Sequence, residues 1–512
     1  MADLSAVGID LGTTYSAVAV VDEHGSPTIL PNAESERLTP SAVFFDDESI
    51  VVGQIAKDAA ATTPDHVVMF VKRQMGNPNW YFPHHQQRYS PTDISAMVLR
   101  KLKQDAESYL GRLLPYAVIT VPAYFEEANR RATIAAGEIA GFRVLDLINE
   151  PTAAAIAFGA HRSEQNETVL IYDLGGGTFD VTIMRIEGQD FRVLASDGAH
   201  QLGGKDFDDA IMRFAVEHFK GEHNFDPAED ATEAGDLRST AEKAKRELSK
   251  RLKTQLMVRS QGRTSRIEIS REQFDSLIKP KIDTTLTLVR STLRDAKLSI
   301  EHIDRVLLIG GSTRVIGVRM ALAQFFGKEP DSSVNPDEAV ALGAAIMAAK
   351  KASEIMPEEV APPIVEKVGG LQITDVTSHS LGIEAFVPGT SQRINSIIIP
   401  RNSPIPTEVS REFVTTLPGQ TAIKVTIFQG EFPDPALCNP VGDFTLGGLP
   451  PNRQPGRKIR VTVSCAASGV VNVTALDLET GTQTITAVSY KVGQSAEQIS
   501  ARGRWLNTKS VV

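Results

Sequence analysis

Two short stretches of the sequence combine an aspartate with glycine and threonine in the same order. The first is residues 8–14, GIDLGTT, and the second is residues 172–178, YDLGGGT. Their aspartates, Asp10 and Asp173, are separated by 173 − 10 = 163 positions. Each stretch lies between two short apolar runs, which predicts a strand–turn–strand hairpin. A hairpin repeated in this way indicates two similar halves of the protein that face one ligand.

The residue types in these turns suit a phosphate group bound together with a metal ion. Glycine allows the tight turn and lets phosphate oxygens approach backbone amides, and threonine hydroxyls add donors. A carboxylate beside a phosphate needs a cation between them, and Mg²⁺ with its water shell fills that role. Neither stretch is a P-loop or a dinucleotide fingerprint, because the glycines precede a strand rather than a helix. The pair predicts a nucleotide held between hairpins; two purely structural turns are the alternative.

The elements that must position these turns alternate between strands and helices up to about residue 351. Residues 117–121, 169–172 and 305–309 are typical of buried strands, and a helix is expected over 126–140. Residues 353–370 are rich in proline and charge and lack a periodic pattern, which predicts an aperiodic interdomain linker. Beyond it, short alternating segments such as 422–427 and 458–463 predict an antiparallel β-sandwich.

We therefore expect a nucleotide-binding domain over residues 1–352, a linker over 353–373 and a sandwich over 374–492. The segment 493–512 is expected to form a short helical tail, with a capping box at residues 495–498, and no lid.

Composition narrows the class of protein further. A chain of 512 residues is too long for a single hydrophobic core, so two or more domains are expected. Its content of 42% hydrophobic and 23% charged residues is typical of folded globular domains. The net charge of −10 argues against nucleic acid and anionic membranes as partners. The sequence contains two cysteines, Cys438 and Cys465, and they do not have CxxC spacing. This argues against a metal cluster and against a disulfide framework. Residues 1–5 show no signal-peptide pattern, so we expect a cytoplasmic protein.

Further motifs extend the pattern of the two turns in a fixed order along the chain. They are residues 119–125 (ITVPAYF), 149–155 (NEPTAAA), 202–208 (LGGKDFD), 309–314 (IGGSTR) and 335–340 (NPDEAV). Together they resemble the heat-shock protein 70 (DnaK-type) chaperones. The resemblance implies an α/β actin-like ATPase domain of two similar lobes, followed by an antiparallel β-sandwich that binds peptides. It implies an ATP-dependent chaperone that hydrolyses ATP and binds extended hydrophobic segments of unfolded polypeptides.

The resemblance also assigns roles around the phosphates. Lys72 corresponds to the cation that reaches the γ-phosphate and places the attacking water, with a solvated lysine as the alternative. Glu150 corresponds to the carboxylate that orients the water and the Mg²⁺ shell. Asp10, Asp173 and Asp180 are assigned to the cations, Mg²⁺ and K⁺. The residues assigned to the phosphates are Gly12, Thr13, Thr14, Tyr15, Gly175, Gly176, Gly177 and Thr178. Asp173 and Thr178 are also assigned a catalytic role.

The adenosine end is expected on one helix face. Glu242, Lys245, Arg246 and Ser249 have the spacing i, i+3, i+4 and i+7, and a solvated charged face is the alternative. By resemblance this face contacts ribose and adenine. Arg246 and Arg314 would stack on the two faces of the base. The other residues implied there are Gly310, Gly311, Ser312 and Asp337.

The second half of the chain supplies the predicted peptide site and its coupling. By resemblance, Pro122, Arg130 and Asp375 relay the nucleotide state to the sandwich. A strand-ending proline and a helix-surface arginine are the alternatives for Pro122 and Arg130. The residues implied to line the peptide cleft are Leu381, Ile383, Phe386, Phe413, Ile423 and Val425, for each of which the sandwich core is the alternative. The resemblance implies unfolded polypeptides as clients and a J-domain co-chaperone as a partner.

Three features depart from the family pattern. The stretch between Lys72 and residue 120 is shorter than usual, which puts contacts with a nucleotide-exchange factor in doubt. The linker reads GGLQITD over residues 369–375, with alternating apolar residues in place of a leucine run, and the long helical lid is missing. Two other functions remain open: a nucleotide-switched interaction protein with weak hydrolysis, and a small-molecule kinase of the same superfamily.

Overall fold

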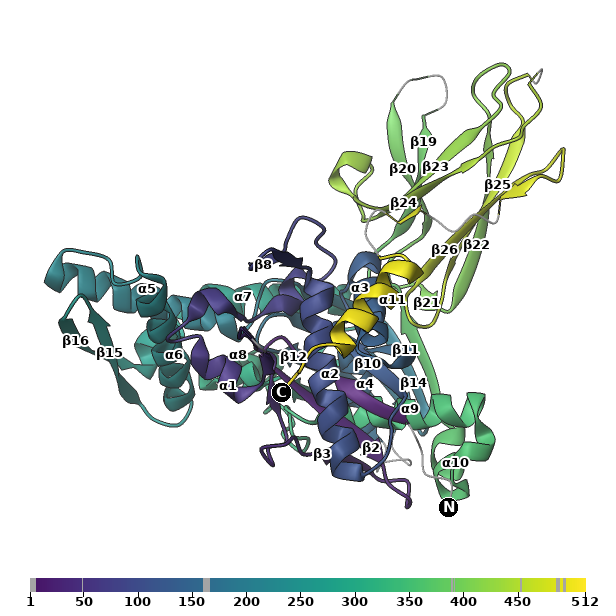
Figure 1. Cartoon of the computed structure of the whole chain (residues 1–512). Helices are drawn as coiled ribbons and strands as arrows, with labels where there is room; N and C mark the ends of the chain where they lie inside the picture. The colour runs from purple at the N-terminus through teal and green to yellow at the C-terminus, as the bar shows by residue number, and fades with distance from the viewer. Residues whose placement is uncertain are drawn as a thin grey trace.

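The computed structural model describes residues 6–47, 49–159, 166–387, 390, 392–451, 454–484, 489–490 and 494–512. The expectation for residues 1–5 therefore lies outside the described residues. Figure 1 shows an α/β body from which a smaller all-β part projects, with the segment of highest residue numbers folded back against the body. None of the described helices combines the length and apolar character that crossing a bilayer requires.

Two six-stranded mixed sheets form the centre of the body. The first has the order β11-β10-β1-β2-β3, with β4 paired to β2, and the second has the order β17-β12-β13-β14-β18-β21. Their bounds are β1 Ala6–Asp10, β2 Tyr15–Val21, β3 Pro27–Leu30, β4 Thr39–Pro40, β10 Tyr116–Val121 and β11 Arg143–Asn149, then β12 Asn166–Leu174, β13 Phe179–Glu187, β14 Asp190–Ala199, β17 Arg305–Ile309, β18 Gln372–Val376 and β21 Pro404–Ile405. In each sheet an antiparallel hairpin, β1–β2 or β12–β13, carries one of the two Asp-Leu-Gly turns, as the sequence predicts.

Two alanine-rich helices, α4 (Glu150–Gly159) and α9 (Ala339–Ile355), share one hydrophobic core with strands of both sheets. Their close approach depends on glycine, because a Cβ added to Gly343 would lie 1.7 Å from the Ala153 carbonyl oxygen. The other face of each sheet is covered by its own helices and its own core. This packing brings the two turns toward each other.

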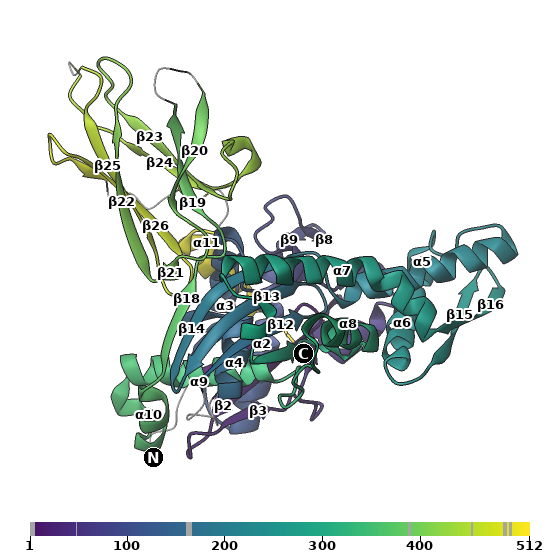
Figure 2. The same ribbon diagram turned by 180° about the vertical axis from the view of Figure 1, so that it is seen from behind.

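The first sheet is covered by α2 (Pro91–Leu110) and α3 (Glu127–Ile139). On the second sheet α7 packs against β13 and β14, whereas α5 and α6 pack with the β15–β16 hairpin, which extends away from the sheet (Figure 2). The bounds of the remaining body elements are α1 Gln54–Ala59, α5 Gly204–His223, α6 Ala231–Leu248, α7 Arg271–Asp295, α8 Ile316–Phe326, η1 Pro64–His66, η2 Val71–Gln74, η3 Ile300–His302, η4 Gly311–Arg314, η5 Pro357–Glu359, β5 Val43–Phe45, β6 Ile50–Val52, β7 Val67–Val68, β8 Phe82–His84, β9 Gln87–Tyr89, β15 Lys253–Ser260 and β16 Arg263–Ser270.

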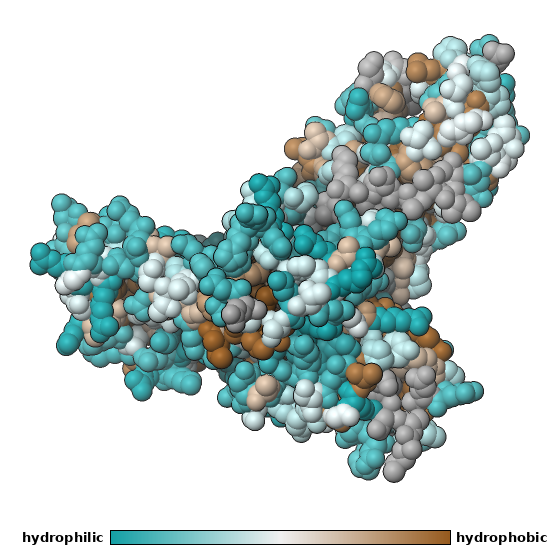
Figure 3. Space-filling view, viewed as in Figure 1, coloured by the Kyte–Doolittle hydropathy of each residue, from teal (hydrophilic) through white to brown (hydrophobic). Residues whose placement is uncertain are grey.

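The all-β part consists of two antiparallel sheets that share one core, which is the predicted sandwich pattern. One sheet has the order β20-β19-β23-β24-β28 and the other β22-β25-β26-β27. The bounds are β19 Leu381–Phe386, β20 Arg393–Ile399, β22 Thr407–Val414, β23 Ile423–Gln429, β24 Asn439–Leu446, β25 Lys458–Cys465, β26 Val471–Asp477, β27 Gln483–Thr484, β28 Ser489–Tyr490 and η6 Pro435–Leu437. Figure 3 shows apolar side chains on this part, and its exposed large apolar residues include Phe386, Leu417 and Phe432.

The stretch predicted as an aperiodic linker is partly helical. α10 (Pro362–Gly369) buries Ile364 and Val368 in the core that α4 and α9 share. The prediction of an aperiodic chain over 353–370 is therefore wrong for these residues. The following strand β18 pairs in parallel with β14 and antiparallel with β21, so the altered linker joins the second sheet as a strand (Figure 2).

The last described segment begins with α11 (Ala496–Asn507), whose N-terminus has the predicted capping box. This helix packs beside α3, with Leu506 buried in the core of the first sheet (Figure 1). Arg502 lies 3.3 Å from the Asp93 carboxylate, and the amide of Val512 donates to the Ile50 carbonyl oxygen at 2.9 Å. The segment is thus bound to the body rather than to the sandwich.

Candidate functional site

The two glycine turns lie against each other. A Cβ added to Gly177 would lie 2.3 Å from Thr13 Cγ2, and one added to Gly176 would lie 1.8 Å from Thr14 Oγ1. Both distances are far inside van der Waals contact, so only glycine lets the second turn approach the threonines of the first. Thr13 and Thr178 are buried there. The turns therefore present backbone amides and hydroxyls from both halves to one small region.

Side chains with opposite charge surround this region. Lys72, from η2, and Glu150, the first residue of α4, are both buried and form an ion pair. Thr120 Oγ1 donates to an Asp10 carboxylate oxygen at 3.1 Å. The amide of Tyr124 donates to Asp180 Oδ1 at 3.2 Å.

Burial and mutual repulsion shift the carboxyl groups of this site. Burial, followed by repulsion from Glu150, raises the pKa of Asp10 and of Asp180 to about 7. The same two causes raise the pKa of Asp173 well above its ordinary value. The second oxygen of Asp180 is buried without a hydrogen-bond partner among the described residues. A divalent cation fits this donor set, because it would compensate the charge of carboxylates that one lysine leaves unbalanced.

The predicted adenosine helix face belongs to α6, and its charged residues are paired. Glu242 accepts from Lys57 at 2.8 Å and from Arg246 at 2.8 Å. Arg246 also donates to the Tyr15 hydroxyl at 2.8 Å. Lys245 lies 2.8 Å from Asp208, so this face contacts the first turn and α5 rather than being a freely solvated charged surface. Ser249 instead donates to the Lys245 carbonyl oxygen of its own helix.

The segment after β17 closes the other side of the second turn. Gly310 has a φ of 81°, and a Cβ there would lie 2.5 Å from the Leu174 carbonyl oxygen. Ser312 Oγ donates to the Gly175 carbonyl oxygen at 2.8 Å. Arg314 forms an ion pair with Asp337 at 2.6 Å, and a Cβ on Gly311 would lie 3.1 Å from the same carboxylate. The α6 face and the segment after β17 thus approach the two turns through Arg246, Gly310 and Ser312, and their part in binding a nucleotide stays a prediction.

Some residues of this region are missed by the sequence analysis. Arg73 donates to the Gly177 carbonyl oxygen at 2.8 Å and pairs with Asp206 at 2.5 Å. Lys57 donates to the Tyr15 hydroxyl at 2.9 Å. The sequence does contain a signal for both residues, because Arg73 directly follows Lys72 and Asp206 lies in the LGGKDFD motif. Lys57 has no such signal, because its partner Glu242 is 185 positions away.

The predicted coupling residues lie between the body and the sandwich. Arg130 of α3 is buried and donates to Asn149 Oδ1 at 2.7 Å and to the Ser468 carbonyl oxygen of the sandwich at 3.0 Å. Asp375 of the linker strand accepts from Asn149 at 2.9 Å and from Thr152 at 2.8 Å. Pro122 directly follows β10 and precedes Ala123, whose carbonyl oxygen accepts from Arg130 at 3.2 Å. Because Asn149 and Thr152 flank Glu150, these bonds connect the linker to the nucleotide region.

The predicted peptide-cleft residues divide into three positions. Leu381, Ile383 and Val425 are buried in the shared core of the sandwich, and Phe413 and Ile423 pack against it. Phe386 is 49% exposed. A separate hollow of about 520 Å³ lies beside β20 and η6 and is lined by other residues, including Ile394, Phe432 and Leu437. Core packing thus accounts for the first three residues, and their role in a cleft stays a prediction.

Comparison with known proteins matches this arrangement to one family. The model of the Hsp70 protein family matches residues 6–81 and 79–504. The chain therefore belongs to the Hsp70 family. It is 43% identical over 507 residues to chaperone protein DnaK of Thermosipho melanesiensis, with 96% of this chain and 82% of that protein covered. It is 42% identical, with the same coverage, to chaperone protein DnaK of Thermotoga neapolitana and of Thermotoga maritima.

Proposed function

We propose that this chain is an ATP-dependent molecular chaperone, in which ATP hydrolysis in the body controls the affinity of the sandwich for extended hydrophobic segments of unfolded polypeptides. The body corresponds to an actin-like ATPase of two similar lobes, and the sandwich to the peptide-binding part. Membership of the Hsp70 family supports both assignments. One observation carries the proposal: Asn149 and Thr152, which flank Glu150 in the chain, both donate hydrogen bonds to Asp375 of the linker strand.

In this proposal each residue of the site has a positioning or charge-balancing role. Mg²⁺, with K⁺ beside it, supplies the positive charge that offsets the triphosphate, and Asp10, Asp173 and Asp180 hold the cations. The amides and hydroxyls of the two turns hold the phosphates. Lys72 and Glu150 orient the attacking water, since phosphoryl transfer depends on position and charge rather than on a covalent intermediate. The α6 face and the segment after β17 hold the adenosine, with Arg246 and Arg314 on opposite faces of the base.

Lys72→Ala tests the assignment of the catalytic lysine. The variant should lose hydrolysis by about 10²- to 10³-fold, as for the loss of one preorganised donor, while still binding ATP through the turns. Single-turnover hydrolysis and equilibrium binding of a fluorescent ATP analogue measure the two effects. Lys101→Ala is the matched control, because Lys101 is also buried in an ion pair, with Asp105 of α2. A Lys72→Ala rate near that of the wild type would refute the role of Lys72.

Clients in this proposal are unfolded polypeptides, and a J-domain co-chaperone accelerates hydrolysis. Client release should require nucleotide exchange and hydrolysis in each cycle. Comparing release with ATP and with a non-hydrolysable analogue distinguishes this function from a nucleotide-switched interaction protein. Equal cycling with both nucleotides would favour the switch and reject the chaperone cycle.

A further inference from the structure

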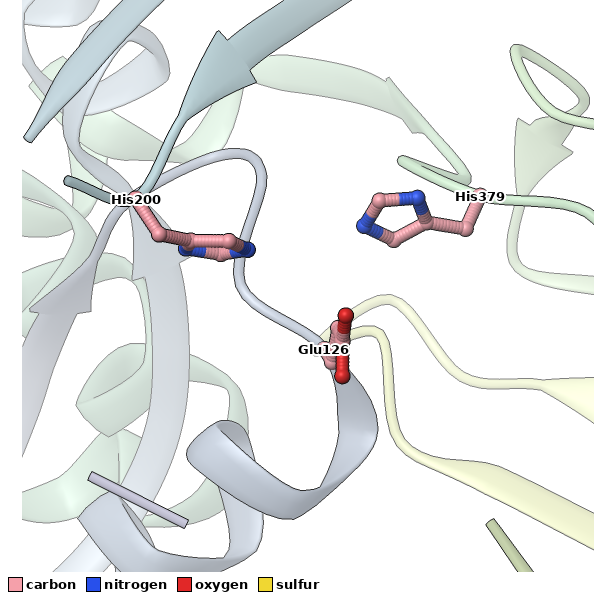
Figure 4. A group of neighbouring side chains, drawn as sticks. All are labelled: Glu126, His200 and His379. Atoms are coloured by element: carbon pink, nitrogen blue, oxygen red, sulfur yellow. The ribbon is translucent and has the colours of Figure 1, made fainter. Parts of the chain in front are cut away.

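A second cluster of chemically active side chains lies apart from the two turns, where the body meets the sandwich. Glu126 is the N-cap residue of α3, His200 directly follows β14, and His379 lies between β18 and β19. One ligand atom from each of the three lies within 4.8 Å of the other two. Figure 4 shows the two imidazole rings and the carboxylate gathered around one space, each from a different segment of the chain.

Hydrogen bonds around this cluster leave its ligand atoms available. Nε2 of His379 is the ring nitrogen that faces the space between the three side chains (Figure 4), and its contact with the Tyr124 carbonyl oxygen, at 3.3 Å, is longer than an ordinary hydrogen bond. Glu126 accepts from Asn439 at 2.6 Å through Oε1, and among the described residues no side chain donates to its Oε2.

Burial makes these groups costly without a ligand. Nε2 of His200 is buried and has no hydrogen-bond partner in the part of the chain that the structure describes. Burial lowers the pKa of both histidines to about 4, which reflects the cost of placing a charged ring here. Burial also raises the pKa of Glu126. A bound cation would satisfy the nitrogen and compensate the carboxylate at once.

The ligand types select the class of metal. Two imidazole nitrogens and one carboxylate oxygen are a common ligand set of Zn²⁺, with the fourth tetrahedral position left to water or another ligand. Zinc–ligand bonds of about 2.0–2.1 Å place tetrahedral ligand atoms about 3.3 Å apart. Side-chain rotations that shorten the distances between the ligand atoms by about 1.5 Å therefore complete the site. Hard cations such as Mg²⁺ prefer all-oxygen sites. We propose that Glu126, His200 and His379 form a Zn²⁺ site.

The position of the site gives it a consequence for the whole molecule. Glu126 and His200 belong to the body, whereas His379 belongs to the segment that enters the sandwich. Neighbouring bonds already join the two parts, since Ser378 Oγ donates to the Ala123 carbonyl oxygen and the Glu127 amide donates to Gln429 at 3.1 Å. The complete ligand set exists only while the sandwich is docked. Zn²⁺ therefore binds the docked arrangement more tightly and shifts the molecule toward it.

The first experiment measures Zn²⁺ binding to the full chain after EDTA treatment, without nucleotide, by titration calorimetry. Wild type should bind one equivalent, and His200→Ala and His379→Ala should each weaken that binding at least 100-fold. Glu126→Gln keeps an amide oxygen for Asn439 and should weaken it at least 10-fold, which guards against loss through misfolding. His24→Ala, at an exposed histidine, is the control and should bind as the wild type does. Absent binding in the wild type, or binding unchanged in both histidine variants, would overturn the site.

The second experiment tests the link to docking. Limited proteolysis of the segment around β18 should slow when Zn²⁺ is added to the wild type and should not change in Glu126→Gln at the same metal concentration. Co²⁺ in place of Zn²⁺ should give visible absorption typical of a low-coordinate site in the wild type, which His379→Ala abolishes. One bound Zn²⁺ without any change in proteolysis would refute the coupling to docking.

Discussion

Arg130→Ala separates coupling from catalysis. The guanidinium of Arg130 is 5% exposed and donates to three acceptors within the body and to the Ser468 carbonyl oxygen of the sandwich at 3.0 Å. The bonds within the body are lost whether or not the sandwich is docked, so only the Ser468 bond favours docking directly. A buried hydrogen bond to a charged group contributes about 1.5–3 kcal/mol, which corresponds to a roughly 10- to 150-fold shift toward the undocked arrangement.

The assay for this variant is single-turnover ATP hydrolysis with and without an unfolded peptide. Arg130→Ala should keep most of its basal hydrolysis, because Arg130 does not contact Lys72, and should lose most of the stimulation by peptide. Arg100→Ala is the matched control, since the hydrogen bond of Arg100 among the described residues lies within the body, to the Ala140 carbonyl oxygen at 3.2 Å. A wild-type stimulation ratio in Arg130→Ala would refute the proposed path through Arg130 and Asp375.

Three further variants test other parts of the structure. Gly177→Ala places a methyl group 2.3 Å from Thr13 and should weaken ATP binding at least 10-fold by fluorescence titration, whereas Gly221→Ala, with open space around it, should bind normally. Burial raises the pKa of Asp208 to about 6, so this carboxyl stabilises the fold below pH 4 and loses that contribution as pH rises to 6. The free energy of unfolding in urea should therefore fall by up to about 3 kcal/mol relative to Asp208→Asn between pH 4 and 6; a constant difference would contradict the shift. Leu506→Ala should cost about 2–5 kcal/mol in the same assay, against almost nothing for Leu113→Ala at a 77% exposed site.

The elements that the sequence predicts well are those whose signal is local. The strand over residues 305–309 and the two glycine hairpins are found where apolar runs and turn residues place them. Glu242, Lys245 and Arg246 share one face of α6 because helical spacing alone decides that. The family resemblance adds Lys72 and Glu150, whose side chains meet although 78 positions separate them.

The features that escaped prediction depend on contacts between distant segments. Helix α10 begins with two prolines and is only eight residues long, with Ile364 and Val368 as its buried apolar residues, so its periodicity is too short to recognise. The docking of α11 on α3 depends on a hydrophobic core that no local pattern reveals. Glu126, His200 and His379 come from three segments, each with an ordinary local sequence, so only the folded chain brings them together.

The measurement that tests the central claim most directly is single-turnover ATP hydrolysis by the full chain across a titration of unfolded peptide, with peptide affinity measured in parallel with ATP and with ADP. The proposed chaperone predicts a hydrolysis rate that rises to a plateau with peptide and a peptide affinity that differs between the two nucleotides. A rate indifferent to peptide, together with one peptide affinity in both nucleotide states, would contradict the coupling of the nucleotide region to the sandwich.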